Sequence, residues 1–220
     1  MNGIIRKSNF ELLRIFAMSC ILYYHLIIYY ILPLNAYSYI IYSLQLPLHV
    51  GVLLFIFISG YFGIKPTLRG WSKLLLMAMI YYIPLQLVYD ITHHAGFGTI
   101  IRDLLVISRG PYWFIKIYLL FYLFVPIVNK FLINLDIKHR FYMLLFLAII
   151  NIWFGCLTRC DISLIDGKSI VNFTLLYVIG DTIRIFEYNL QKWNTITLLA
   201  IFICFNMFIM LSSYIFLEVL

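Results

Sequence analysis

Long, almost uninterrupted apolar stretches constrain this chain more than any other feature of its sequence. A helical membrane crossing needs about 20 mostly apolar residues, and seven stretches of the 220-residue chain are near that length. Because runs such as Leu74 to Ile80 are continuously apolar, without the alternation of a transmembrane β-strand, the sequence predicts an all-α, polytopic transmembrane helix bundle. Its spans are expected near residues 15–34, 39–62, 74–89, 110–129, 141–158, 170–186 and 196–217.

Composition excludes the other broad classes of protein. The chain is 64% hydrophobic and 11% charged, whereas soluble domains are roughly 25% charged. It contains only nine acidic residues and is 19% aromatic, which argues against a disordered chain. Without an internal repeat, a low-complexity tract or a Pro/Gly/Ser linker, residues 1–220 are expected to form a single membrane-embedded domain.

The distribution of basic residues predicts which end of each span is cytoplasmic. Short loops rich in Lys and Arg stay in the cytoplasm. With the N-terminus inside, eleven basic residues fall on the inner side and four on the outer side. We therefore expect a multi-pass protein of the cytoplasmic membrane with a cytoplasmic N-terminus. The net charge of +7 then reflects topology and attraction to anionic lipid, and no basic run predicts nucleic-acid binding.

Two features outside the apolar cores leave alternatives open. On the outer side, residues 99–107 suit a short helix at the membrane interface, and a plain loop fits equally well. The four cysteines form no Cys-x-x-Cys pair, so no metal site is expected. Cys156 and Cys160 fall near an outer membrane end, where a disulfide is possible, but small apolar packing residues are the simpler interpretation.

Ionisable groups inside the first span are the strongest functional signal. Arg14 and His25 are eleven residues apart, about three helical turns, and they share a face with Glu11, Met18 and Tyr29. Alone, Arg14 is explained as an interfacial anchor paired with Glu11, and His25 as a hydrogen-bonded packing residue. The functional alternative makes His25 a general base or nucleophile, because an intramembrane ionisable group is costly and usually has a role.

Other spans contribute weaker candidates. Ser59 belongs to a Ser-Gly pair that permits close backbone approach and offers a hydroxyl. Trp113 fits an interfacial aromatic belt, and Lys116 either snorkels outward or binds an anionic group. Asp181 and Arg184 are expected to neutralise each other at i, i+3, whereas His49 receives no role from the sequence. Pro126 is expected to kink its span.

Three motifs, in order, resemble membrane-bound acyltransferase family 3, which acylates carbohydrates. The first is Phe10 to Arg14 followed by His25, an Arg and a His separated by ten residues. The second is the stretch from Gly51 to Phe62, similar to Gly-Val-x-Leu-Phe-x-x-x-Ser-Gly-Tyr-Phe. The third consists of Trp113, Phe114, Tyr118, Tyr122, Pro126 and Asn129. A looser fourth match is the stretch from Tyr177 to Gly180.

The resemblance implies transfer of an acyl group, expected to be acetyl, from cytoplasmic acyl-CoA to a hydroxyl of a cell-surface or lipid-linked saccharide. It implies His25 as general base or acyl carrier, Arg14 as donor ligand, and Ser59 as a residue that positions His25 or donates to the oxyanion. Acetyl-CoA would be a substrate, with no bound cofactor. The expected substrate-binding residues are Glu11, Arg69, Lys73, Trp113 and Lys116.

Two departures from the family leave competing interpretations. Seven spans are fewer than the family's domains have, so the chain resembles their N-terminal part, and Asp181 stands where an aromatic residue is expected after Gly180. An inactive acyltransferase fragment is therefore one alternative. A non-catalytic seven-span receptor or transporter-like protein is the other, although the two halves show no matching broken spans.

Overall fold

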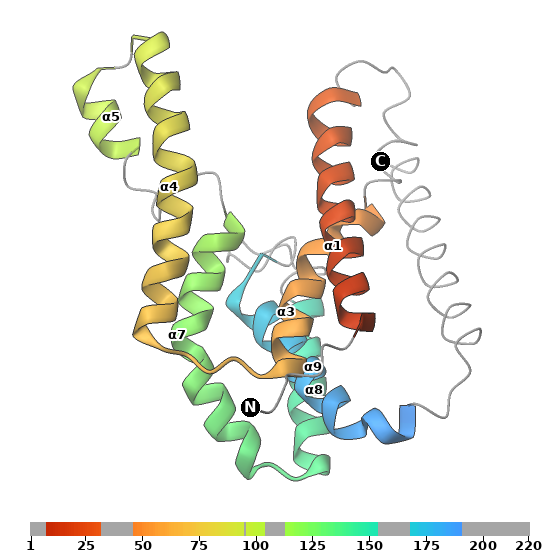
Figure 1. The fold of residues 1–220 in the computed structure, drawn as a ribbon. Coiled ribbons are helices and arrows are strands. Elements are labelled where there is room, and N and C mark those ends of the chain that lie inside the picture. Colours follow the sequence, from red (N-terminus) through yellow and green to blue (C-terminus); the bar gives the residue numbers. More distant parts are fainter. Residues whose placement is uncertain (1–7, 32–45, 95, 104–112, 154–167, 191–220) are drawn as a thin grey trace. The chain divides into compact units, whose positions relative to one another are not determined.

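The described part of the chain is mainly helical, with short non-helical connections. The computed structural model describes residues 8–31, 46–94, 96–103, 113–153 and 168–190, and these residues contain no strand (Figure 1). Within them, three helices are long and apolar enough to cross a membrane, namely Asn9–Tyr29, Leu68–Thr92 and Trp113–Asn134, and Pro47–Phe62 is a shorter apolar helix. The all-α prediction is confirmed. The stretch at 196–217, the segment 39–45, and Cys156 and Cys160 lie outside the described residues.

The chain divides into two compact units. Unit 1 comprises Met1–Phe62 with Gly180–Leu220, and unit 2 comprises Gly63–Ile179. Helix α9 (Ile170–Leu190) contributes its first residues to unit 2 and its later residues to unit 1.

Unit 1 is built on close helix contacts at glycines. Helix α1 (Ser8–Leu26) continues as the π-helix η1 (Ile27–Ile31), and the 3-10 turn η3 (Leu46–His49) leads into α3 (Val50–Phe62). A Cβ on Gly51 would lie 2.6 Å from the Ala17 carbonyl oxygen, and one on Gly180 would collide with the Phe57 carbonyl oxygen. Small residues therefore let α1 and α9 each approach α3, as is typical of helix pairs in membranes.

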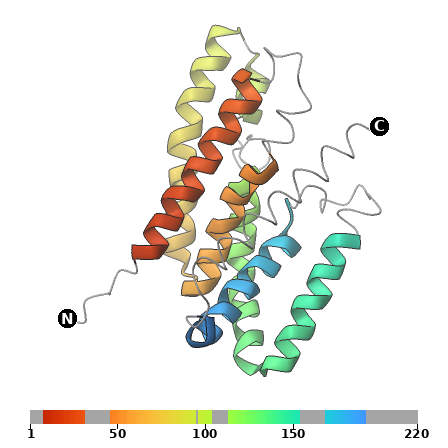
Figure 2. The same ribbon diagram turned by 90° about the vertical axis from the view of Figure 1, so that its right-hand side faces the viewer.

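Unit 2 is an antiparallel pair of long helices with shorter ones attached. Helix α4 (Leu68–Thr92) runs beside α7 (Trp113–Asn134) in both views (Figures 1 and 2). Helix α5 (Phe97–Asp103) follows the end of α4, and α8 (Ile137–Ile152) follows α7. Phe173 on α9 packs against Phe121 on α7, with ring centroids 6.1 Å apart, and both side chains are fully buried.

Helix α4 is longer than the sequence predicted. It begins six residues before the expected 74, because the Thr67 hydroxyl caps it by accepting from Gly70 N–H at 3.0 Å. The first turns carry the exposed residues Arg69 and Lys73. The predicted span begins after them because it is based on continuous apolar residues. Both α4 and α7 continue as α-helices through Pro84 and Pro126, as transmembrane helices often do. Of the two alternatives for residues 99–107, α5 shows a short helix as far as Asp103.

The turn between α7 and α8 is fixed by two charged side chains. Asp136 caps α8 by accepting from His139 N–H at 3.1 Å, and its carboxylate also pairs with the His139 side chain. The hydrogen bond from that side chain, followed by the one from the backbone, lowers the pKa of Asp136 below its ordinary 3.8. Buried Arg140 donates to the carbonyl oxygens of Leu132 and Leu135 at the end of α7, which satisfies carbonyls that have no partner within the helix.

Candidate functional site

Helices α1 and α3 run antiparallel, and this register decides which predicted site residues of unit 1 can meet. Near the start of α1, Phe10 packs on Tyr61 with ring centroids 4.3 Å apart. Gly51 lies against the middle of α1, beside Ala17. Near the end of α1, Tyr24 packs on His49 at 4.3 Å. The start of α1 therefore faces the end of α3, and the His25 end of α1 faces η3.

Arg14 is held at the start of α1 by two partners. It donates to the Glu11 carboxylate at 2.7 Å, as predicted for an i, i+3 pair, and its guanidinium lies 5.7 Å from the Phe62 ring centroid. The Arg14 side chain is still 41% exposed. A guanidinium carries five N–H donors, so donors remain beyond the one that Glu11 occupies.

A groove of about 390 Å³ begins at Arg14 and follows the same side of α1. Its described lining consists of Glu11, Arg14, Ile15, Met18, Ser19 and Leu22. The charged residues lie at one end, and the lining along the helix toward Leu22 is mostly apolar. The described lining ends at Leu22, one turn before His25. The guanidinium and the imidazole are ~16 Å apart along the helix axis.

His25 is exposed near the end of α1 and hydrogen-bonds through one ring nitrogen. The imidazole is exposed, and Nδ1 lies 2.8 Å from the Ile21 carbonyl oxygen. Since a carbonyl only accepts, Nδ1 carries the proton in this contact and Nε2 keeps its lone pair. Nε2 makes no hydrogen bond to a described residue. Tyr29 stacks on the imidazole at 6.0 Å, and the Tyr24 ring meets it edge to face at 5.4 Å.

The structure does not bring Ser59 to His25. Ser59 is two residues before Tyr61 and therefore lies toward Phe10, at the opposite end of the α1–α3 contact. Its hydroxyl donates to the Phe55 carbonyl oxygen at 2.8 Å within its own helix. The sequence cannot distinguish this i−4 bond from a bond to another helix. Ser59 is therefore given no part in the mechanism proposed below.

Two further predicted residues of unit 1 pair with each other. Asp181 is buried, and its carboxylate binds the Arg184 guanidinium one turn later on α9. The predicted i, i+3 pair is confirmed.

The remaining predicted site residues lie in unit 2, at different levels of the helix pair. Arg69 and Lys73 are exposed in the first turns of α4, where Trp71 Nε1 donates to the Leu119 carbonyl at 3.2 Å. Trp113 begins α7, and the Lys168 Nζ lies 5.6 Å from its ring centroid. Lys116 is half-buried one turn beyond Trp113. Trp113 and Lys116 thus lie in the first turn of α7, whereas Arg69 and Lys73 lie in the first turns of the antiparallel helix α4.

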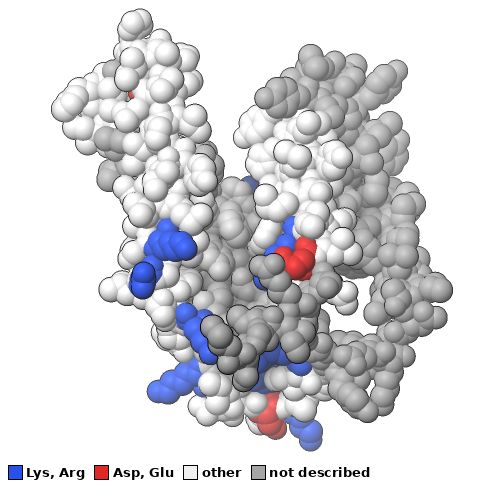
Figure 3. Space-filling model, in the orientation of Figure 1, with Lys and Arg blue, Asp and Glu red and all other residues white. Residues whose placement is uncertain are grey.

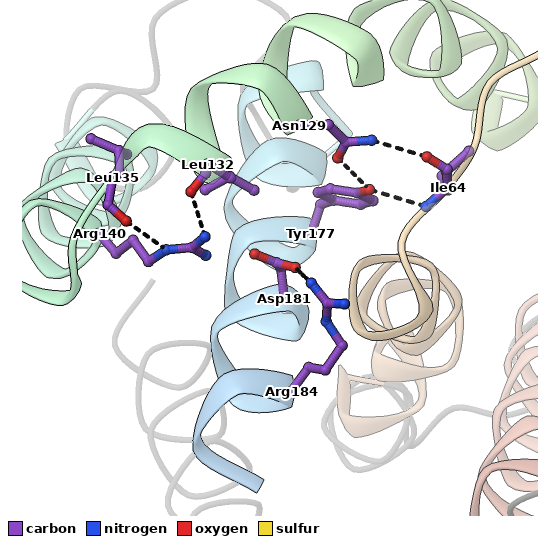
Figure 4. A network of polar contacts seen from close by, with 8 residues as sticks. All are labelled: Ile64, Asn129, Leu132, Leu135, Arg140, Tyr177, Asp181 and Arg184. Carbon is purple, nitrogen blue, oxygen red and sulfur yellow. Dashed lines mark hydrogen bonds and ion pairs between the residues drawn. The ribbon is translucent and has the colours of Figure 1, made fainter.

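Three residues of the family-like motifs hold the chain segment that precedes α4. The Tyr177 hydroxyl donates to Asn129 Oδ1 at 2.8 Å and accepts from Ile64 N–H at 3.1 Å. Asn129 Nδ2 donates to the Ile64 carbonyl at 3.0 Å, which closes the network (Figure 4). Two turns earlier on α7, the Tyr122 hydroxyl accepts from Thr67 N–H at 3.1 Å. Tyr122, Asn129 and Tyr177 therefore have a structural role, and we call them the tyrosine clamp.

Exposed basic residues of unit 2 gather at the end where α4 begins. Lys65, Arg69 and Lys73 lie at that end, with Lys130 and Lys138 around the turn from α7 to α8. Figure 3 shows blue side chains beside the start of α4 and none on the visible face of its far end. At the far end, the buried Asp90 carboxylate accepts from Gln86 Nε2 at 2.9 Å.

Sequence reasoning missed His49 and the tyrosine clamp. His49 contacts Tyr24 across the helix pair, and Ile64 and Tyr177 are 113 residues apart, so neither contact has a local sequence signal. Among the described residues, no three His, Cys, Asp or Glu side chains could hold a metal ion.

Comparison with known proteins adds no information on the function of this chain. No family model, curated protein or solved structure matches this chain.

Proposed function

We propose that this protein is an integral-membrane acyltransferase of the family that its motifs resemble. It moves an acyl group, expected to be acetyl, from acyl-CoA to a hydroxyl of a cell-surface or membrane-associated saccharide. The observation that supports this most directly is the arrangement along α1, where a groove lined by Arg14 and Leu22 ends one turn before His25, whose Nε2 makes no hydrogen bond to a described residue. An anion-binding group and a base on one helix suit a reaction between an anionic donor and a neutral hydroxyl.

The donor is proposed to bind with its phosphates at Arg14. Charge-assisted hydrogen bonds from a guanidinium to phosphate are strong and geometrically specific. Glu11 and Phe62 orient the guanidinium. The mostly apolar lining beside Met18 and Leu22 would accommodate the linear arm of the donor, which carries the thioester toward His25.

The chemical step needs one base. His25 Nε2 accepts the proton of the acceptor hydroxyl while the hydroxyl oxygen attacks the thioester carbonyl carbon. The C–S bond then breaks, the ester remains on the saccharide, and the CoA sulfur takes up the proton from the imidazolium. Hydrogen bonding of Nδ1 to the Ile21 carbonyl favours the neutral tautomer with the proton on Nδ1, which leaves Nε2 as the base before the step and after it.

The proposed topology has seven spans and a cytoplasmic N-terminus. The exposed basic residues at one end of unit 2, including Arg69 and Lys73, support placing that end in the cytoplasm. There they would attract the anionic donor by their charge. Trp113 and Lys116, at the other end of α7, would lie near the outer surface, where the saccharide is expected.

Transfer of labelled acetyl from acetyl-CoA to membrane glycan tests the proposal. Membranes containing the protein are compared with membranes containing His25→Ala at equal abundance. His93→Ala is the matched control, since His93 is an exposed histidine that stacks on Tyr89 in unit 2. We expect label with the parent chain and His93→Ala, and none with His25→Ala. Equal label in His25→Ala would remove the assigned base. Absence of label in every sample would favour the non-catalytic alternatives.

A further inference from the structure

Four aromatic rings from three segments gather where α1 ends. His25 stacks on Tyr29 of η1 and meets the edge of Tyr24 on α1, and Tyr24 packs on His49 of η3 with ring centroids 4.3 Å apart. His49 is therefore one ring removed from His25, on a segment that is distant in sequence. Tyr24 and His49 are both half-buried, whereas His25 is exposed.

The backbone departs from α-helical winding on both sides of this cluster. Helix α1 becomes the π-helix Ile27–Ile31 two residues after His25, and no proline lies within those five residues. In the segment that carries His49, the 3-10 turn Leu46–His49 ends at His49, and regular α3 begins at the next residue. In contrast, α4 and α7 remain α-helical through an internal proline.

We propose that His49 is a positioning residue for His25, acting through the ring of Tyr24. This inference rests on the function proposed above. An exposed imidazole with one hydrogen bond can still turn about its side-chain torsions, and such turning would move Nε2 away from the acceptor hydroxyl. The edge of Tyr24 and the face of Tyr29 restrict the turning, and His49 restricts Tyr24 from the other helix.

The size of the effect follows from the kind of contact. An aromatic pair changes an equilibrium by about tenfold at most, and loss of alignment in a reacting group acts on the chemical step. His49→Ala should therefore lower kcat up to about tenfold and leave the KM for acetyl-CoA unchanged, since the donor is held at Arg14.

Replacement by a second ring separates positioning from direct chemistry. His49→Phe keeps a ring against Tyr24 but has no nitrogen, and His49→Asn keeps a polar group but has no ring. If His49 acts by packing, the Phe variant restores kcat to within about twofold of the parent and the Asn variant does not. The reverse pattern would overturn the inference. His93→Ala again serves as the matched control.

A readout that does not depend on transfer follows the imidazole itself. Diethylpyrocarbonate acylates exposed neutral imidazole, and mass spectrometry gives the rate at His25 within the intact membrane protein. We expect His49→Ala to change this rate at least threefold and His49→Phe to leave it as in the parent. If the protein transfers no acetyl but His49→Ala still changes the acylation rate at His25, the positioning role stands and the acyltransferase proposal fails. Normal transfer with unchanged kcat and an unchanged His25 rate in His49→Ala would overturn the inference alone.

Discussion

The tyrosine clamp of unit 2 and the ring cluster at His25 in unit 1 use similar residues in opposite ways. In the clamp, Tyr177 is only 1% exposed, and its hydroxyl both donates and accepts. At the end of α1, His25 is exposed and one of its two nitrogens makes no hydrogen bond to a described residue. Buried polar groups with their hydrogen bonds made stabilise a fold. An exposed, oriented nitrogen that no described residue hydrogen-bonds is available for chemistry.

The largest effect expected from this contrast is on catalysis. His25→Ala should lower acetyl transfer by at least about 100-fold, which is the usual contribution of a general base. The thermal unfolding midpoint in detergent should fall only slightly, because the exposed imidazole hydrogen-bonds within its own helix turn and its described ring contacts are those with Tyr24 and Tyr29. A large fall in the midpoint would mean that His25 belongs with the structural residues.

Tyr177→Phe should show the reverse pattern. Removal of the hydroxyl leaves Ile64 N–H and Asn129 Oδ1 without this partner in a buried network, which costs about 1–3 kcal/mol of unfolding free energy. Denaturation in detergent measures the loss. Tyr142→Phe is the control, since Tyr142 is an exposed tyrosine of the same unit. Equal stability of the two variants would contradict the clamp.

Arg14→Lys should change donor binding more than turnover. Lysine keeps the charge but loses the fork that binds phosphate in two places, so the KM for acetyl-CoA should rise about fivefold while kcat changes little. Arg184→Lys is the control, because Arg184 pairs with Asp181 on α9. A change in kcat alone would place Arg14 with the chemistry.

The smallest effect is expected at Asp136. Because its folded pKa lies below 3.8, chiefly through the hydrogen bond from the His139 side chain, ionised Asp136 stabilises the fold above that pH. The contribution is lost as pH falls through the lowered pKa. Asp136→Ala should therefore reduce the unfolding midpoint slightly at pH 7 and by less at the acid end, where the protonated carboxyl still accepts from His139 N–H. Asp136→Asn should retain the cap and lose only the pH dependence. A pH-independent difference would contradict the assignment.

The sequence predicted local features well and contacts between segments poorly. Helical character and the Glu11–Arg14 and Asp181–Arg184 pairs depend on apolar length and on i, i+3 spacing, both of which are visible in one chain. The start of α4 was missed because Arg69 and Lys73 interrupt the apolar run, although lysine and arginine stems can extend a helix into the interface.

Site residues divide in the same way. Arg14 and His25 are on one helix, so their shared face follows from helical geometry alone. The expected contact between Ser59 and His25 required the relative direction of α1 and α3, which only packing at Gly51 and Phe10 reveals. His49 and Tyr177 act on segments far away in sequence, and no periodicity reports such pairs.

Arg140 has two successive tasks under the proposed topology. Its charge counts toward the inner side while the chain is being inserted and no helix has yet packed. After folding, the guanidinium is buried against carbonyl oxygens of Leu132 and Leu135 and no longer faces lipid or cytoplasm. A neutral replacement would therefore affect membrane insertion and, separately, the folded turn between α7 and α8. The amount of protein in the membrane would fall even where the inserted protein is correctly oriented.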